Sequence, residues 1–449
     1  MNHSPHRFRH FLVTISFVLA AIVGVFATSN LTADVLYTGT NLAGADFGEG
    51  NLPGIYNTHY TYPTPQEVDY FVEKGMNTFR IPFRWERLQQ SQNASLNTVE
   101  LGRLESIVDY ATSQGAHVVL DPHNYARYFG NVIGSGSLPY ESYNDFWTRL
   151  ADEFKDNDKV IFGLMNEPNT MPTEQWGAAA QGAINAIRAT GADNLILVPG
   201  NGWTGAHSWL QNWYGTSNAT VMGGITDPTN NFAFDVHQYL DNDSSGTSST
   251  IVSATIGQER LVAITNWLRD NNQKAFLGEF AVANSTIGAG IGDEAMANML
   301  NYMDDNDDVW LGWTWWAGGP WWNNYRFTVE PTNLGQPNEA DRPVLGVIQP
   351  FFAQNEPPAD SADFDGDGDV DGRDFLIWQR GFSLVGQEDN SNGDANHDGT
   401  VDAEDLAVFQ TQYGMDSMDS IEAVQVPEQS TLVFALIVLL FSNRVIARI

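Results

Sequence analysis

Between residues 37 and 353 the chain alternates short apolar segments with amphipathic ones, and this alternation restricts the possible folds more than any other feature. Parallel strands that are covered on both faces consist of nearly continuous apolar runs of this kind. Eight segments have the required length and character: residues 37–44, 77–83, 116–124, 160–167, 194–201, 232–239, 275–280 and 310–317.

Helical patterns lie between these segments. Residues 64–75 have Thr64 as N-cap, Pro65 at the first helical position and Gly75 as the stop signal. Residues 97–115 and 259–272 have apolar side chains at helical spacing. Eight strands that are each followed by a helix predict an α/β fold, the (β/α)8 TIM barrel. A doubly wound open sheet is the alternative, but no Gly-rich nucleotide loop follows the first strand.

Polar and aromatic side chains recur at the carboxyl ends of these predicted strands, and the second strand is expected to end in Arg80. Each one alone has a structural explanation, such as a hydrogen-bonded interior histidine or a packed tryptophan. The carboxyl ends of all barrel strands meet on one face, so together these residues predict an active site there. They are Arg80, His123, Asn124, Asn166, Glu167, His237, Tyr239, Glu279, Trp315 and Trp316.

Glu167 and Glu279 would then lie across one pocket. The chain has no Cys, so it has no disulfide and no thiolate metal site. Without a Ser nucleophile motif either, two carboxylates favour the cleavage of a glycosidic bond. That reaction needs one group to protonate the leaving oxygen and another to meet the developing oxocarbenium ion.

Neighbouring residues are suited to support this chemistry. Asn166 offers an amide donor for a sugar 2-hydroxyl, and Trp316 offers a flat face for a pyranose ring. Arg80 would keep Glu279 ionised, since a nearby cation lowers the pKa of a carboxyl group, and Tyr239 would donate a hydrogen bond to it. The net charge of −34 argues against nucleic acid as a partner.

From residue 37 to about residue 352 the chain resembles glycoside hydrolase family 5, and most closely its fungal-type cellulase subfamily. The matching segments are GTNLAGADFG, FRIPFRW, DPHNYARY, GLMNEP, FDVHQYLD, GEF and WTWWAGG. The resemblance implies that Glu167 is the acid/base, that Glu279 is the nucleophile and that the activity is that of a retaining endo-β-1,4-glucanase without a catalytic cofactor. It also implies that the substrate-binding residues are Arg80, His123, Asn166, His237, Tyr239 and Trp316. The chain departs from the fungal pattern in lacking Cys and in having GEF where those members often have TET.

About half of the net negative charge lies between Asp360 and Glu428, where one acidic pattern occurs twice, 31 residues apart. Each copy has oxygen ligands at positions 1, 3, 5, 9 and 12 and Gly at position 6, as in an EF-hand-like calcium loop. The candidate ligands are Asp363, Asp365, Asp367, Asp369, Asp371 and Asp374 in the first copy, and Asp394, Asn396, Asp398, Thr400, Asp402 and Asp405 in the second.

The two loops, each followed by an amphipathic helix, resemble a type I dockerin module. The resemblance implies two bound calcium ions and a cohesin-like protein partner. Loop positions 10 and 11, which usually carry recognition residues, are Gly372 and Arg373 in the first copy and Ala403 and Glu404 in the second.

Both termini have the pattern of processed segments. A basic stretch followed by an apolar one predicts an export signal over residues 1–33, with cleavage near residue 27 or 33, rather than a membrane anchor. The apolar run 431–441 follows VPEQS and precedes Arg444, which resembles a PEP-CTERM sorting signal that an exosortase removes. The expected organisation is therefore an exported protein with a catalytic domain at 35–353, a linker at 354–362, a dockerin-like module at 363–414 and a sorting segment at 426–449.

Two alternatives remain open at this point. The same mechanism would serve another β-glycan, such as mannan, mixed-linkage glucan or xyloglucan, because the loops that select the substrate are not readable from the sequence. A non-catalytic carbohydrate-binding surface protein would keep Trp316 but would have no need of both Glu167 and Glu279.

Overall fold

The computed structural model describes residues 35–288, 290–353, 361–365, 369–387, 390–396 and 399–414. In the first two of these ranges, parallel strands form a closed barrel in the order β1–β10–β9–β8–β7–β6–β3–β2. The predicted (β/α)8 barrel is thus confirmed, and the open sheet is wrong. The barrel strands are β1 (Tyr37–Leu42), β2 (Thr78–Phe83), β3 (His117–Pro122), β6 (Val160–Gly163), β7 (Ile196–Pro199), β8 (Phe232–His237), β9 (Ala275–Phe280) and β10 (Trp310–Gly318).

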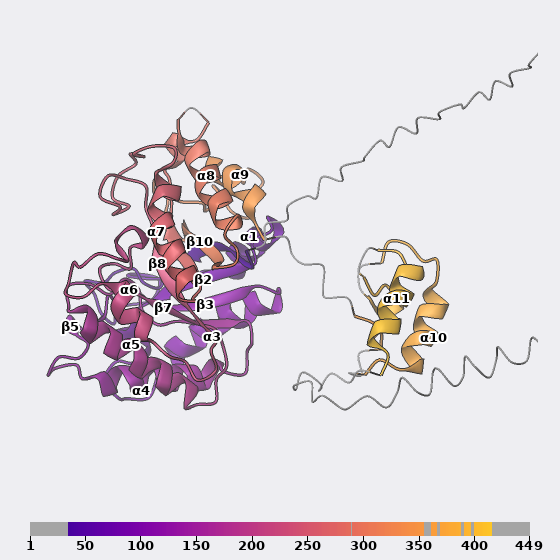
Figure 1. The fold of residues 1–449 in the computed structure, drawn as a ribbon, viewed down its shortest axis with the longest axis horizontal. Coiled ribbons are helices and arrows are strands. Elements are labelled where there is room, and N and C mark those ends of the chain that lie inside the picture. The colour runs from indigo at the N-terminus through magenta and orange to yellow at the C-terminus, as the bar shows by residue number, and fades with distance from the viewer. Residues whose placement is uncertain are drawn as a thin grey trace, which may run out of the picture.

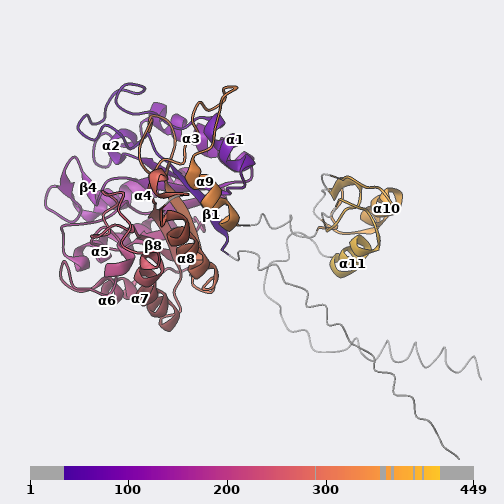
Figure 2. The same ribbon diagram turned by 90° about the horizontal axis from the view of Figure 1, so that it is seen from above.

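A helix follows each barrel strand, and the helices lie around the outside of the strands (Figure 1, Figure 2). They are α1 (Pro65–Glu73), α2 (Trp85–Leu88), α3 (Thr98–Ser113), α4 (Tyr140–Phe154), α5 (Thr173–Arg188), α6 (Asn218–Val221), α7 (Ile256–Asp270), α8 (Gly292–Asp304) and α9 (Pro343–Ile348). Short 3-10 turns lie at Ala206–Ser208, Met222–Gly224, Asn284–Thr286 and Gln349–Phe351.

The first predicted helix begins and ends as its sequence indicates. Thr64 precedes α1, its backbone N–H donates to the Glu67 carboxylate at 2.8 Å, and Pro65 is the first helical residue. Gly75 follows the helix with a φ of +104°, a conformation that costs glycine little. The hairpin β4 (Arg127–Tyr128) and β5 (Asn131–Val132) was not predicted, because two-residue strands have too little periodicity to detect.

Alternation along the strands sorts side chains between the barrel interior and the layer under the helices. On β3, Val118 and Leu120 belong to the large core between strands and helices, whereas Val119 belongs to a separate interior cluster. That interior cluster consists of Val119, Ile161, Leu197, Ala233, Phe276 and Leu311. Two residues further along two of these strands come Asp121 and Asp235, so the interior becomes polar toward the carboxyl ends.

The C-terminal module contains α10 (Gly372–Gly381), the turn Asn390–Asn392 and α11 (Ala403–Gln412). Its own core cluster consists of Ala362, Phe364, Val370, Ala395 and Phe409. The predicted export signal, the sorting segment, residues 354–360 of the predicted linker and the ligands Asp367 and Asp398 lie outside the described residues. Across the described ranges, no helix has both the length and the apolar character needed to cross a membrane.

Candidate active site

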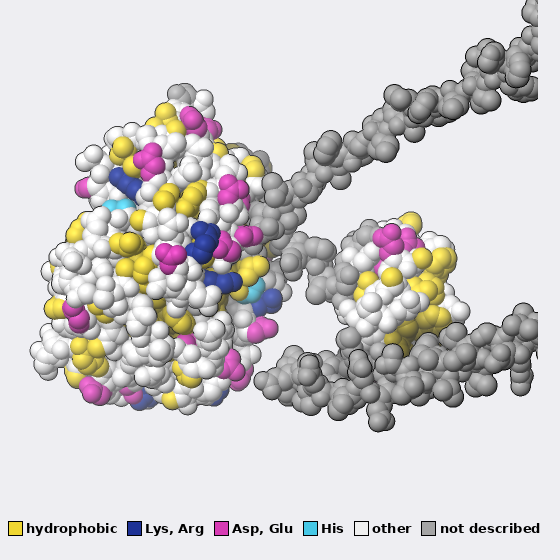
Figure 3. All heavy atoms as spheres, in the orientation of Figure 1, with side chains coloured by type: hydrophobic (Ala, Val, Ile, Leu, Met, Phe, Trp, Pro, Cys, Tyr) yellow, Lys and Arg dark blue, Asp and Glu magenta, His cyan; other side chains and the backbone are white. Residues whose placement is uncertain are grey.

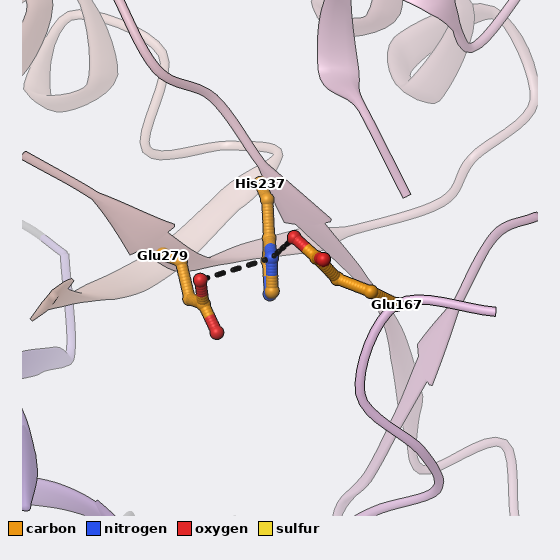
Figure 4. A group of neighbouring side chains, drawn as sticks. All are labelled: Glu167, His237 and Glu279. Carbon is orange, nitrogen blue, oxygen red and sulfur yellow. Dashed lines mark hydrogen bonds and ion pairs between the residues drawn. The ribbon is translucent and has the colours of Figure 1, made fainter. Parts of the chain in front are cut away.

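Glu167 and Glu279 approach each other at the carboxyl-end face of the barrel. Glu279 lies near the end of β9, and Glu167 lies four residues after β6. Each presents a carboxylate oxygen within 4.8 Å of the other, with a nitrogen of His237 in the same cluster. His237 lies between them, with Nδ1 2.8 Å from Glu167 Oε1 and 3.5 Å from Glu279 Oε2 (Figure 4). The pair is therefore close enough to act on one sugar unit.

Glu167 has a φ of +42°, in the left-handed region that a residue with a Cβ rarely adopts. Pro168 follows it, and the Pro168 carbonyl accepts a hydrogen bond from the Trp203 N–H at 3.0 Å. The apolar run that begins at Val160 therefore ends in a turn, which directs the Glu167 side chain toward His237 rather than continuing the strand.

Arg80 is the third residue of β2 and not its last, so the prediction that it lies at a strand end is wrong. It is an interior side chain, 1% exposed, and is long enough to reach the polar layer. Its Nη1 lies 3.0 Å from Glu279 Oε1, and its Nη2 lies 3.0 Å from Asp121 Oδ2. Nη1 also donates to Asn41 Oδ1 at 2.7 Å. One cation thus compensates two buried acids.

Hydrogen bonds that start at Arg80 fix the orientation of an amide and the tautomer of a histidine. Arg80 donates to Asn166 Oδ1 at 2.7 Å, so the Asn166 amide nitrogen faces His123 Nε2 at 3.0 Å. Nε2 must therefore accept, and His123 Nδ1 donates to Asp121 Oδ2 at 2.8 Å. Burial lowers the pKa of His123 well below its usual range, which agrees with a neutral ring.

Burial raises the pKa of both central carboxyl groups. It raises the pKa of Glu167 to about 8, although Arg80 opposes the shift. It raises the pKa of Glu279 to about 7, although His237, Arg80 and the hydrogen bond from Tyr239 oppose the shift. The expected effect of Arg80 on Glu279 has the predicted sign, but desolvation outweighs it. Both carboxyl groups therefore keep a proton to a higher pH than free glutamate does.

The remaining predicted residues divide into two groups. The Tyr239 hydroxyl donates to Glu279 Oε2 at 2.8 Å. Trp316 stacks on His123 with ring centroids 5.4 Å apart and is partly exposed, so it faces the site.

Trp315 does not face the site. It is fully buried and donates its indole N–H to the Phe327 carbonyl, as a packing residue of the outer core. Asn124 binds the Trp85 N–H and the Glu86 carboxylate instead of facing the central pair.

Sequence reasoning missed Asn41 and Asp121. Both are buried. Arg80 donates a hydrogen bond to Asn41 and forms an ion pair with Asp121. The strand alternation contains the signal for Asp121, because it precedes His123 by two residues and so points to the same interior as that residue. Asn41 near the end of β1 has the same signal in the first strand.

The acidic loops of the small module repeat one pattern of hydrogen bonds. Asp374 Oδ1 accepts from the Phe364 N–H at 2.7 Å, and Asp405 Oδ1 accepts from the Ala395 N–H at 2.7 Å. Carboxylate oxygens of Asp363, Asp365 and Asp374 lie within 4.8 Å of one another. In the second loop, Asp394 Oδ1 is buried and accepts no hydrogen bond from the residues that the structure describes. An all-oxygen set with such an atom suits a hard cation such as calcium.

A closed (β/α)8 barrel with two carboxylates poised on its carboxyl-end face defines a glycoside hydrolase. The family model described as Cellulase (glycosyl hydrolase family 5) matches residues 40–319. The chain therefore belongs to glycosyl hydrolase family 5. A second model, the dockerin type I domain, matches residues 361–412.

Relatives and solved structures agree with this membership. Endo-beta-1,4-glucanase A of Emericella nidulans is 41% identical over 350 residues, which cover 77% of this chain and 99% of that protein. The structure of endo-beta-1,4-glucanase Xac0029 from Xanthomonas axonopodis pv. citri is 46% identical with a TM-score of 0.68, covering 71% of this chain and 99% of that one. Cel5A (EG2) from Hypocrea jecorina is 30% identical with a TM-score of 0.64, covering 71% of this chain and 99% of that one.

Proposed function

We propose that the chain is a retaining endo-β-1,4-glucanase that uses Glu279 as nucleophile and Glu167 as general acid and base. The proposal rests on the approach of one carboxylate oxygen of each residue to within 4.8 Å of the other. Retaining glycosidases place the two carboxyl groups about 5–5.5 Å apart, whereas inverting ones leave about 6.5–9.5 Å for a water molecule. The names of the relatives support the same activity.

In the first half of the reaction, Glu279 attacks the anomeric carbon while protonated Glu167 gives its proton to the leaving glycosidic oxygen. The bond to that oxygen breaks, and a glycosyl ester forms on Glu279. The pKa of about 8 keeps Glu167 protonated in neutral solution. The amide nitrogen of Asn166, whose orientation Arg80 fixes, is available to the substrate 2-hydroxyl, where a hydrogen bond strengthens in the transition state.

In the second half, Glu167 takes a proton from water, and the oxygen of that water attacks the anomeric carbon and releases Glu279. Esterification has removed the negative charge of Glu279, so the pKa of Glu167 falls while the ester exists. The same residue therefore serves as acid in one step and as base in the next. Each displacement inverts the configuration of the anomeric carbon, so the two together restore the β configuration.

The six other site residues form the substrate-binding set of this proposal: Arg80, His123, Asn166, His237, Tyr239 and Trp316. Arg80 and Tyr239 hold Glu279, and His237 contacts both carboxylates. Trp316 offers its partly exposed ring to a pyranose unit.

Proton NMR of the first products from cello-oligosaccharides tests the stereochemistry, and reducing-end release from a panel of soluble β-glycans tests the substrate. The proposal expects an initial β-anomer and the fastest release from β-1,4-glucan. An initial α-anomer would exclude Glu279 as nucleophile. Faster release from mannan, mixed-linkage glucan or xyloglucan would change the assigned substrate and leave the assigned mechanism unchanged.

For the small module we propose two calcium ions, one in each acidic loop, and a cohesin-like protein partner. The match to the dockerin type I domain supports both. Hydrophobic side chains gather on the visible face of this module (Figure 3), and such patches are typical of protein interfaces. Its exposed large hydrophobic residues are Leu376, Phe382, Leu384, Val385 and Tyr413.

The boundaries and the processing of the chain belong to the same proposal. They are an export signal at 1–33, a catalytic domain at 35–353, a linker at 354–362, the module at 363–414 and a sorting segment at 426–449 that an exosortase removes. The apolar runs near both termini support this organisation. Mass spectrometry of the exported protein tests it, because both runs should be missing from the mature chain.

A further inference from the structure

Tyr239 owes its position to a loop that the proposed mechanism does not otherwise use. The loop spans residues 241–250 and follows Tyr239, which lies two residues after β8. Burial raises the pKa of Tyr239 well above its usual range, so the hydroxyl stays protonated and donates to Glu279 Oε2 at 2.8 Å. Whatever fixes this ring therefore fixes a hydrogen bond to the proposed nucleophile.

Gly246 contacts the Tyr239 ring through its backbone. Its φ is +68°, and a Cβ at this position would lie 2.7 Å from Cδ1 and 2.8 Å from Cγ and Cε1 of Tyr239. Separations below about 3.0 Å are far inside normal carbon contact, which is about 3.5–4.0 Å. Only glycine leaves room for the ring where it now lies.

Asp241 stabilises the conformation of this loop through hydrogen bonds to its backbone. Its side chain is 2% exposed, and its carboxylate accepts the backbone N–H groups of Gly246 at 3.1 Å, Thr247 at 3.2 Å and Ser248 at 3.2 Å. The Ser245 hydroxyl also donates to it at 3.2 Å. One carboxylate thus sets the path of the segment that contacts Tyr239.

Residues from other elements also contact Tyr239. Phe327 lies against the ring with centroids 6.3 Å apart and an angle of 25° between the planes. Arg260 on α7 donates to the Tyr239 carbonyl at 2.7 Å. Arg326, next to Phe327, donates to the Thr247 carbonyl and so links the loop to the segment that contains Phe327.

We propose that Asp241 and Gly246 are positioning residues for glycosidic bond cleavage, which hold the Tyr239 hydroxyl on the nucleophile Glu279. This inference rests on the proposed function, because it takes Glu279 as the nucleophile. The hydrogen bond stabilises ionised Glu279, so a displaced ring leaves the nucleophile protonated over a wider pH range. The expected signature is an upward shift of the acidic limb of the kcat/KM profile.

Gly246→Ala in the full chain tests this inference, with Gly115→Ala as the matched control. Gly115 has a φ of +83°, but no atom lies within 4 Å of the Cβ position, so alanine there has the same backbone cost without the ring contact. We expect Gly246→Ala to lower kcat/KM about 10- to 100-fold, as for loss of a hydrogen bond to a charged group. Its acidic limb should move up by about one pH unit, which corresponds to a tenfold change in the ionisation equilibrium. Gly115→Ala should keep the wild-type profile.

A double-mutant cycle with Tyr239→Phe separates positioning from a merely structural role. In the Phe background, Gly246→Ala should cause no further shift of the limb, because the hydroxyl is already gone. Asp241→Asn, which keeps the shape of the side chain, should shift the limb in the same direction by less. If the profiles of Gly246→Ala and Asp241→Asn match that of Gly115→Ala, the inference is overturned. Activity retained by Glu279→Gln would instead overturn the proposed function.

Discussion

Glu167 combines three unfavourable features in one residue: a left-handed backbone, a half-buried carboxyl group and a like-charged neighbour in Glu279. Such costs persist where the surrounding structure imposes them, and they cluster at active sites. Here the surroundings are His237 and the turn after β6. The desolvation that raises the pKa of Glu167 should therefore destabilise the fold at a pH where the free carboxyl group is ionised.

Glu167→Gln should flatten the decline of stability with rising pH. The folded pKa of about 8 lies above the ordinary value of 4.5, so between these pH values the unfolded chain releases a proton that the folded chain retains. Stability then falls as pH rises through this window, and it is unaffected by Glu167 below it. Glutamine does not titrate, so the Tm difference between pH 5 and pH 8 should be smaller in the variant. An equal or larger difference would contradict the raised pKa.

The two proposed catalytic residues should differ in their response to the leaving group. Glu279→Gln should abolish turnover of every substrate, because no nucleophile remains. Glu167→Gln should lose cellulose hydrolysis but retain much of the glycosylation rate with an activated aryl cellobioside, whose leaving group needs little protonation. Burst kinetics of aryl release measures this step. Equal losses on both substrates in the Glu167 variant would reverse or exclude the assignment.

Arg80 should affect both the pH profile and the stability. The kcat/KM profile should be bell-shaped, with the acidic limb near the lower pKa, that of Glu279, and the basic limb near that of Glu167. Arg80→Ala should raise the acidic limb and cost about 3–5 kcal/mol of stability, because Glu279 and Asp121 would be left buried without their cation. Arg80→Lys keeps the positive charge. The pH midpoint of its acidic limb should therefore lie closer to the wild-type value than its kcat/KM does. An unmoved acidic limb in the alanine variant would refute the pairing.

At the scale of elements, the neighbouring strands β8 and β9 pack closely at Gly278, where the absence of a side chain leaves room for Asp235. A Cβ at Gly278 would lie 2.3 Å from Asp235 Oδ1, inside the barrel. The position of Asp235 in the polar interior thus depends on a neighbouring strand position without a side chain. By contrast, Gly346 lies on the exposed side of α9 with no atom within 4 Å of its Cβ position.

These two glycines should respond oppositely to alanine. Gly346→Ala should stabilise the protein by about 0.5–1 kcal/mol, because alanine restricts the unfolded chain and favours the helix. Gly278→Ala should destabilise it and reduce activity, because Asp235 must move in a packed interior. Urea unfolding of both variants measures the difference. Stabilisation by Gly278→Ala would mean that the interior is looser than the contact indicates.

The whole molecule combines two units that reach stability by different means. The barrel has a large apolar core between strands and helices, whereas the module has the small cluster around Phe364 and Phe409 and a high density of carboxylates. A cation that binds only the folded module offsets this repulsion. At a thousandfold excess over Kd it adds about 4 kcal/mol.

A chelator should therefore unfold the module and leave glucanase activity on soluble substrate unchanged. A chain ending at Gln354 should likewise stay active, because every proposed catalytic residue lies in the barrel. Calorimetry should show two calcium binding events, and Asp363→Asn with Asp374→Asn should remove one of them. Identical helical circular dichroism of the module with and without calcium would contradict this account.

Local periodicity determined much of this protein from sequence alone. Apolar runs located all eight barrel strands, caps located the ends of α1, and the strand ends pointed to Glu167, Glu279, His237 and Tyr239 as one group. Spacing located the two acidic loops, because the candidate ligands of each loop lie close together in the chain. These features are readable because each depends on residues close in the chain.

Tertiary structure alone decided the rest, because the relevant contacts join distant residues. Arg80 binds Asn166 and Glu279, which are 86 and 199 positions away, and so became an interior residue rather than the end of a strand. Packing buried Trp315 and left Trp316 beside His123, although the two are adjacent in sequence. Burial also overrode the cation in setting the pKa of Glu279. Desolvation depends on everything that surrounds a group, and a chain has no such surroundings until the barrel closes.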